Sequence, residues 1–105
     1  MLHDSKMESI DISKAGNLSK FELKRNVVHI FTVGENPLLT KLYLGDQNMN
    51  ELKISEYSIN NNLEELWLWR NKIISLDLAN FNNLKVLNAS DNKIKSLTLS
   101  DSGKI

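Results

Sequence analysis

The sequence predicts a mostly β solenoid of stacked coils with little or no helix, and three observations support this fold class. First, an apolar residue followed by others at offsets +3, +5, +10, +13 and +15 occurs four times, starting at Leu18, Leu39, Leu63 and Leu84. Second, the copies begin 21, 24 and 21 residues apart, a period typical of repeat proteins. Third, apolar and polar residues alternate within each copy, and no sustained helical pattern of apolar residues interrupts them.

The first element of each coil is a short strand near offsets +2 to +5, where apolar and polar residues alternate with period 2. These strands are predicted at residues 20–23, 41–44, 65–68 and 86–89. Equivalent strands of successive coils stack in parallel, so they predict a sheet along one side of a flattened core.

A second apolar set at offsets +10, +13 and +15 ends in alternation again. The alternating pairs are Phe31/Val33, Leu52/Ile54, Leu76/Leu78 and Leu97/Leu99. This pattern predicts a second short strand in each coil, and stacking of these strands predicts a second sheet on the opposite side of the core.

Offset +8 carries an amide side chain in every copy: Asn26, Gln47, Asn71 and Asn92. An amide placed just after a strand can satisfy main-chain donors and acceptors where the chain turns inward, so we expect a structural ladder of these residues. Gln47 is one methylene longer than the others. Its copy also contains three extra residues, within positions 55–62, so we expect a bulged loop and local distortion in the second coil.

These residues resemble the leucine-rich repeats, whose pattern is L-x-x-L-x-L-x-x-N-x-I/L. The segment LEELWLWRNKI at 63–73 matches every fixed position, and LKVLNASDNKI at 84–94 matches with Ala89 in place of one leucine. The short period resembles the bacterial, internalin-like class of these repeats. That resemblance implies parallel strands on a concave face, a nearly helix-free convex face, and extracellular adhesion through the concave sheet. A cytosolic regulatory scaffold is equally compatible with it.

The repeat register divides the chain into a partial coil 1–17 and coils 18–38, 39–62, 63–83 and 84–104. Extended in both directions, the register reaches Leu2 and Ile105, so the chain begins and ends within a repeat. We expect residues 1–105 to be a segment of a longer array, because solenoids normally finish in polar caps. The alternative is a complete short protein that self-associates end to end.

Composition and motifs argue against several classes of function. The 13 basic and 13 acidic residues cancel, which argues against nucleic-acid binding, and no apolar run is long enough for membrane insertion or a signal peptide. We therefore expect a soluble chain and leave its compartment open. With two histidines, no cysteine, no phosphate-binding loop and no nucleophile elbow, we expect neither an enzyme nor a cofactor or metal.

Side chains between the leucines of the first strand should face solvent, and three of the four Trp and Tyr residues occupy such positions in two adjacent coils. The candidate partner-binding residues are Tyr43, Trp67, Trp69, Arg70, Glu65, Lys41 and Asn88. Trp, Tyr and Arg are the residues most enriched in interface hot spots. The alternatives are cross-strand packing that only stiffens the sheet and a platform on which carbohydrate stacks.

Three functions are compatible with this pattern. The chain could be a protein-protein interaction module that binds through its concave face, a structural spacer or cell-surface adhesion segment of a larger repeat protein, or a targeting domain attached to an enzyme outside this chain. The aromatic positions favour the first of these.

Overall fold

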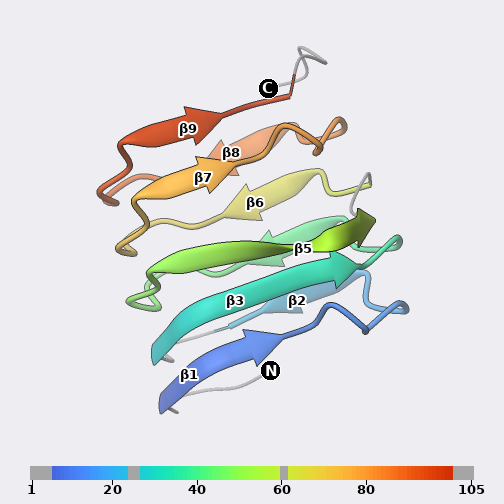
Figure 1. The fold of residues 1–105 in the computed structure, drawn as a ribbon, viewed down its shortest axis with the longest axis horizontal. Helices are drawn as coiled ribbons and strands as arrows, with labels where there is room; N and C mark the ends of the chain where they lie inside the picture. The colour runs from blue at the N-terminus through green and yellow to red at the C-terminus, as the bar shows by residue number, and fades with distance from the viewer. Residues whose placement is uncertain (1–5, 24–26, 60–61, 101–105) are drawn as a thin grey trace.

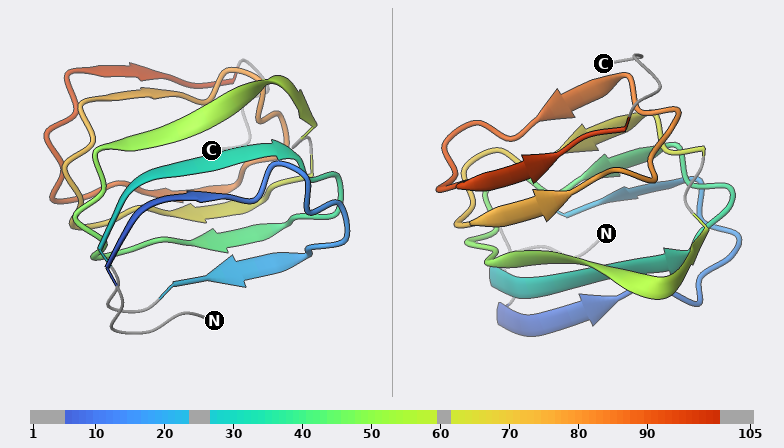
Figure 2. Two further views of the ribbon diagram at one scale, coloured as in Figure 1. Left: turned by 60° about the horizontal axis from the view of Figure 1, so that its bottom comes forward. Right: turned by 45° about the horizontal axis from the view of Figure 1, so that its top comes forward.

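A computed structural model describes residues 6–23, 27–59 and 62–100. The chain winds into stacked coils, and each coil places one strand on either side of a flattened core (Figure 1, Figure 2). All strand pairs are parallel and equivalent strands recur at about the repeat period, so the predicted solenoid is confirmed. The described residues contain no helix, and hence none that could span a membrane.

One side of the solenoid is a four-stranded sheet of order β2-β4-β6-β8. Its strands are β2 (Lys20–Glu22), β4 (Lys41–Tyr43), β6 (Glu65–Trp67) and β8 (Val86–Asn88). Each begins where the alternation predicts and ends one residue earlier. The register joins Lys20, Lys41, Glu65 and Val86 in one row, so residues at the same repeat offset become neighbours.

The opposite side carries β1 (Lys6–Asp11), β3 (Val27–Glu35), β5 (Glu51–Ile59), β7 (Ser75–Asp77) and β9 (Ser96–Thr98). The prediction of a single second sheet is wrong for this part of the chain. The strands form a three-stranded sheet β1-β3-β5 and a separate pair β7-β9, so β5 and β7 are not paired.

The extra residues of the second coil lie next to this break. β3 advances two residues from Val33 to Glu35 while β5 advances five from Ile54 to Ile59, so β5 accommodates three more residues through a register shift. The insertion is therefore a bulge within a strand rather than a separate loop. Figure 2 shows the end of β5 twisting away from the stack at this point.

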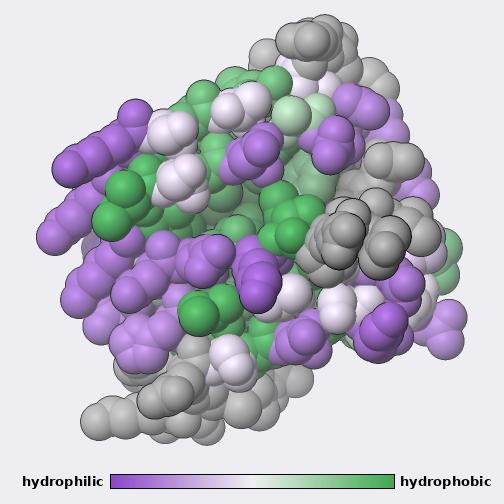
Figure 3. All heavy atoms as spheres, viewed as in Figure 1, coloured by the Kyte–Doolittle hydropathy of each residue, from purple (hydrophilic) through white to green (hydrophobic). Residues whose placement is uncertain are grey.

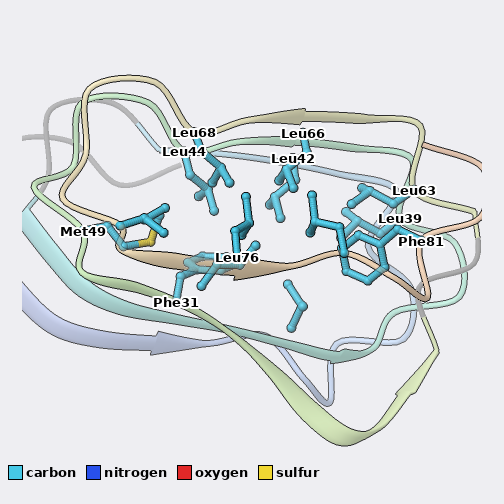
Figure 4. Packing of buried hydrophobic residues seen from close by; sticks show 14 of the residues in the cluster. Phe31, Leu39, Leu42, Leu44, Met49, Leu63, Leu66, Leu68, Leu76 and Phe81 are labelled. Carbon is cyan, nitrogen blue, oxygen red and sulfur yellow. The ribbon is translucent and has the colours of Figure 1, made fainter. Parts of the chain in front are cut away.

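The core lies between the two sides and consists mainly of the predicted apolar positions together with Phe81 (Figure 4), whereas Leu97 and Leu99 of the last coil are exposed. Leu42 and Leu66 from the four-stranded sheet point toward Phe31 and Leu76 from the opposite strands, and all four are almost completely buried. Burial of each such side chain stabilises the fold by about 1.5–3 kcal/mol. The repeat spacing thus works by stacking equivalent leucines from coil to coil.

The amide residues at offset +8 bind main-chain groups of two successive coils. The Asn71 Nδ2 group donates to the carbonyls of Leu44 and Leu68 at 2.9 Å and of Trp69 at 3.3 Å, and its Oδ1 accepts from the N–H groups of Gln47 and Met49 at 3.0 and 2.9 Å. Asn92 donates to Leu68, Ala89 and Ser90 and accepts from Ile73. Gln47, fully buried, donates to Leu23 and Gly45. Asn26, like Leu2 and Ile105, lies outside the described residues.

Asn36 is a buried amide that the sequence pattern does not predict. It is fully buried, its Nδ2 group donates to the carbonyls of Ile12 and Ala15, and its Oδ1 accepts from the N–H of Gly34 at 2.8 Å. The equivalent position of the third coil, at offset +18, is occupied by buried Phe81. A polar and an aromatic side chain therefore fill the same site in different coils.

Candidate binding surface

Five of the seven candidate residues lie on the four-stranded sheet. Lys41 pairs with Glu65 across β4 and β6, and Tyr43, Trp67 and Asn88 follow one another across β4, β6 and β8. Trp69 and Arg70 lie just beyond the end of β6. Tyr43, Trp67 and Trp69 together are called the aromatic patch below.

Tyr43 and Trp67 form a tilted aromatic pair, with ring centroids 6.2 Å apart and planes at 37°. Glu65 holds both rings, because its Oε1 accepts hydrogen bonds from the Tyr43 hydroxyl at 3.3 Å and from the Trp67 Nε1 group at 3.2 Å. Its Oε2 lies 3.7 Å from the Lys41 Nζ atom. The Glu65 carboxylate thus contacts three other candidate residues and fixes the orientation of two rings.

Trp69 lies over the backbone of the preceding coil. A β-carbon added to Gly45 would overlap the indole atoms Cε2, Nε1 and Cδ2, so the ring occupies space that only glycine leaves free. The Arg70 guanidinium lies 5.5 Å from the Trp69 ring centroid, within cation–π range. It also lies 3.8 Å from the Asp46 carboxylate. Trp69 is 36 % exposed despite these contacts.

Arg70 has a left-handed backbone conformation, with φ of 55°. Asp46 and Asp91, at the same offset of their own coils, have φ of 58° and 56°. Asp and Asn tolerate this region, whereas a long side chain such as Arg costs about 1–2 kcal/mol there. Because the positive φ recurs at this offset in three successive coils, it belongs to the turn of the repeat, and Arg70 is the residue for which that turn is most strained.

The surroundings of Tyr43 in the aromatic patch raise its pKa. Burial raises the pKa of Tyr43, and the negative charge of Glu65 raises it further, whereas Lys41 partly opposes the shift. Tyr43 therefore stays a neutral hydrogen-bond donor toward Glu65 well into alkaline solution.

Asn88 does not join this network. Its Oδ1 accepts from the N–H and the hydroxyl of Ser90 at 3.1 and 2.8 Å, so its side chain folds onto its own turn. Conversely, Lys20, Gly45 and Asp46 contribute although they were not among the candidates. The Lys20 Nζ atom lies 5.3 Å from the Tyr43 ring centroid. The sequence could have indicated Lys20 and Asp46, because Lys20 has the same repeat offset as Lys41 and Asp46 has the same offset as Arg70.

Within the described ranges, no three His, Asp or Glu side chains are placed to hold a metal ion. Comparison of the chain with protein-family models, with curated proteins and with solved structures yields no match.

Proposed function

We propose that the chain is a leucine-rich repeat solenoid that binds a partner protein through the outer face of its four-stranded sheet, with the aromatic patch as the centre of the interface. The single observation that carries the proposal is the arrangement of Tyr43, Trp67 and Trp69 with Arg70 on adjacent coils. Nothing about the core requires aromatic residues there, because the leucines between them already fill it.

The leucine-rich repeat assignment is supported by the burial of the pattern residues. In the third coil, Leu63, Leu66, Leu68, Asn71 and Ile73 occupy the fixed positions of the pattern and are all buried. The amide of Asn71 also bonds the main chain, as the Asn position of such repeats requires. The resemblance to this family implies partner binding through the strand face.

The chemistry of the patch favours a protein partner. Each aromatic side chain can bury about 150–250 Å², and the polar groups of Tyr43 and Trp67 are already bonded to Glu65, which lowers the cost of desolvation. Glu65 and Arg70 hold the rings in place before binding, so little side-chain entropy is lost when a partner docks. Tyr43 and Trp67 are half-buried and Trp69 and Arg70 are exposed, and such a pre-oriented group of Trp, Tyr and Arg has the composition of an interface hot spot.

The test is selection of binding partners followed by substitution. A displayed library of small folded domains is selected against the chain, and each selected binder is tested against Trp67→Ala and Trp69→Ala. We expect most binders to weaken by tenfold or more, with the melting temperature of the chain little changed. Leu97→Ala, an exposed aliphatic change in β9 on the opposite side, is the matched control.

Three outcomes would contradict the proposal. If most binders are indifferent to both Trp substitutions, the patch is not a preferred interface. If the substitutions lower the melting temperature without affecting binders, the rings serve mainly to stiffen the sheet. Glycan binding that is lost in Trp67→Ala would assign the patch to carbohydrate instead.

A further inference from the structure

The break between β5 and β7 leaves a groove on the side of the solenoid opposite the aromatic patch. Its volume is about 730 Å³, within the range of about 300–1,000 Å³ typical of ligand sites. Buried Leu52 and Phe81 lie among its lining residues, together with exposed Ile74. Figure 3, which views this side, shows apolar surface in the hollow between the upper and lower strands. We call this space the β5–β7 groove.

The main chain on both sides of the groove lacks the pairing found elsewhere in the solenoid. At the equivalent places of other coils, the Ile12 N–H donates to the Thr32 carbonyl at 3.0 Å and the Leu78 N–H donates to the Thr98 carbonyl at 2.7 Å. The counterpart here would run from the Ile54 N–H to the Asp77 carbonyl, but β5 and β7 share no ladder.

In a parallel strand, successive residues direct their main-chain N–H and carbonyl groups toward opposite neighbouring strands. This alternation identifies the other main-chain groups that are unpaired at the groove. Because the Ser96 N–H donates to the Ile74 carbonyl and the Leu78 N–H to the Thr98 carbonyl, Ile74, Leu76 and Leu78 direct their main-chain groups toward β9. Ser75 and Asp77 therefore direct theirs toward β5. By the same repeat offsets, Leu52 and Ile54 direct theirs toward β7. Two strand edges thus face each other across one groove with donors and acceptors open.

The rim of the groove carries an excess of negative charge. Glu51 and Asp77 are exposed carboxylates that take part in none of the ion pairs between described residues. The one lysine of the rim, Lys53, lies in register with Thr32 and Asp11 across the sheet. The Lys53 charge also acts on Asp11, whose pKa is lowered mainly by the Ser13 hydrogen bonds and then by Lys14 and Lys53, and the two rim carboxylates still outnumber this one lysine.

We propose that the β5–β7 groove binds an extended peptide segment with alternating apolar and basic side chains, which adds a parallel strand between the two open edges. Its apolar side chains face Leu52 and Phe81, and its basic side chains face Glu51 and Asp77. This is strand addition, in which main-chain hydrogen bonds provide affinity and alternate side chains provide specificity. The proposal goes beyond the aromatic patch and concerns a separate surface.

The probe is a capped, fluorescein-labelled octapeptide of alternating valine and lysine, whose binding to the full chain is followed by fluorescence polarisation. In a parallel strand that follows the solenoid pattern, inward residues direct their N–H groups toward β7 and outward residues toward β5. N-methylation of the lysines therefore removes the donors that face β5, and N-methylation of the valines removes those that face β7. We expect at least one methylated peptide to bind about tenfold or more weakly.

Charge is tested with a matched pair of variants. Glu51→Lys reverses one rim carboxylate, and Glu35→Lys makes the same change in net charge at a half-buried residue that pairs with Lys14 outside the groove lining. We expect Glu51→Lys to weaken binding several-fold and Glu35→Lys to change it little. The Trp67→Ala variant should bind the peptide normally, since it alters the other side of the solenoid.

Amide hydrogen exchange gives a readout at the proposed edges. In the free chain, the amides of Ser75 and Asp77 should exchange faster than those of Leu76 and Leu78, which face β9, and the peptide should slow them. The proposal is overturned if the unmethylated peptide does not bind, if all three peptides bind equally, or if Glu51→Lys and Glu35→Lys behave alike.

Discussion

The indole ring of Trp69 lies over Gly45 of the preceding coil, in the space that a β-carbon at Gly45 would occupy. This contact positions the most exposed ring of the aromatic patch without a hydrogen bond to its nitrogen among the described contacts. It makes the patch dependent on a residue that has no side chain.

Replacement of Gly45 by alanine should therefore displace the Trp69 ring. We expect changed tryptophan fluorescence and near-ultraviolet circular dichroism, and weaker binding of any partner selected on the patch, with a loss of stability below about 2 kcal/mol. Gly16→Ala is the matched control, because its nearest neighbour, the Glu35 carbonyl oxygen, would lie at an ordinary 3.9 Å. Identical spectra for both variants would show that the ring is not held by Gly45.

Asn71→Ala should be among the more destabilising single changes at a polar residue. It removes the bonds to two coils and leaves buried N–H and carbonyl groups unpaired, so we expect a loss of about 1–3 kcal/mol in urea denaturation. Asn92→Ala should cost less because that amide is only half-buried, and exposed Asn80→Ala serves as the control. Equal urea midpoints for Asn71→Ala and Asn80→Ala would show that the ladder hydrogen bonds of Asn71 do not stabilise the fold.

Arg70→Gly should stabilise the chain while it weakens binding at the patch. Glycine adopts φ near 55° without strain, so we expect a gain of up to about 1 kcal/mol, and the exposed ion pair to Asp46 offsets little of it. Lys72→Gly is the control for a nearby position without positive φ and should lower stability. A loss of stability in Arg70→Gly would show that its side-chain contacts outweigh the backbone strain.

The pKa of Tyr43 gives a test of the Glu65 hydrogen bond. Because the folded-state pKa is raised, the protonated form is favoured in the fold. The associated stability is present below the unfolded pKa and is lost as pH rises through the folded value. Glu65→Gln should lower the pKa of Tyr43 by removing a negative charge.

The measurement is an ultraviolet absorbance titration of tyrosinate in a Tyr57→Phe background, which leaves Tyr43 as the single tyrosine. Glu64→Gln is the control, since that neighbouring carboxylate pairs with Lys85 instead. Equal Tyr43 titrations in the two variants would contradict the proposed contact.

Deletion of residues 56–58 should restore the 21-residue period of the second coil. We expect β5 then to pair with β7, which would protect the amides of Ser75 and Asp77 from hydrogen exchange and raise the melting temperature. Leu76 and Leu78, whose amides already face β9, are internal controls. Unchanged exchange at Ser75 and Asp77 would mean that the inserted residues do not cause the break.

The repeat pattern predicts the core and the four-stranded sheet well because each of their positions recurs at a fixed offset. Leu42, Leu66 and Leu68 are buried by their equivalents in neighbouring coils, so one coil predicts the next. The same reasoning places Tyr43 beside Trp67, since register follows directly from the period.

The features that escaped prediction depend on differences between coils. Asn36 fills in one coil the site that Phe81 fills in another, and Trp69 needs a glycine one coil earlier at its own offset. The break between β5 and β7 depends on where β5 shifts its register against β3 to accommodate the bulge. The number of inserted residues alone does not specify that position. The left-handed conformation of Arg70 was also missed, although Asp46 and Asp91 at the same offset are of a residue type that tolerates a positive φ.

The unpaired edges of β5 and β7 also bear on how the chain unfolds. In a repeat protein, cooperativity comes from the coupling between adjacent coils, and uniform coupling makes a short array melt as one unit. Here the second and third coils are joined through β4 and β6 but not through a ladder between β5 and β7. The coupling between these two coils should therefore be weaker than that between coils paired on both sides. The coils on the two sides of this interface should behave as separate folding units, with distinct transitions in calorimetry where a uniform solenoid would give one.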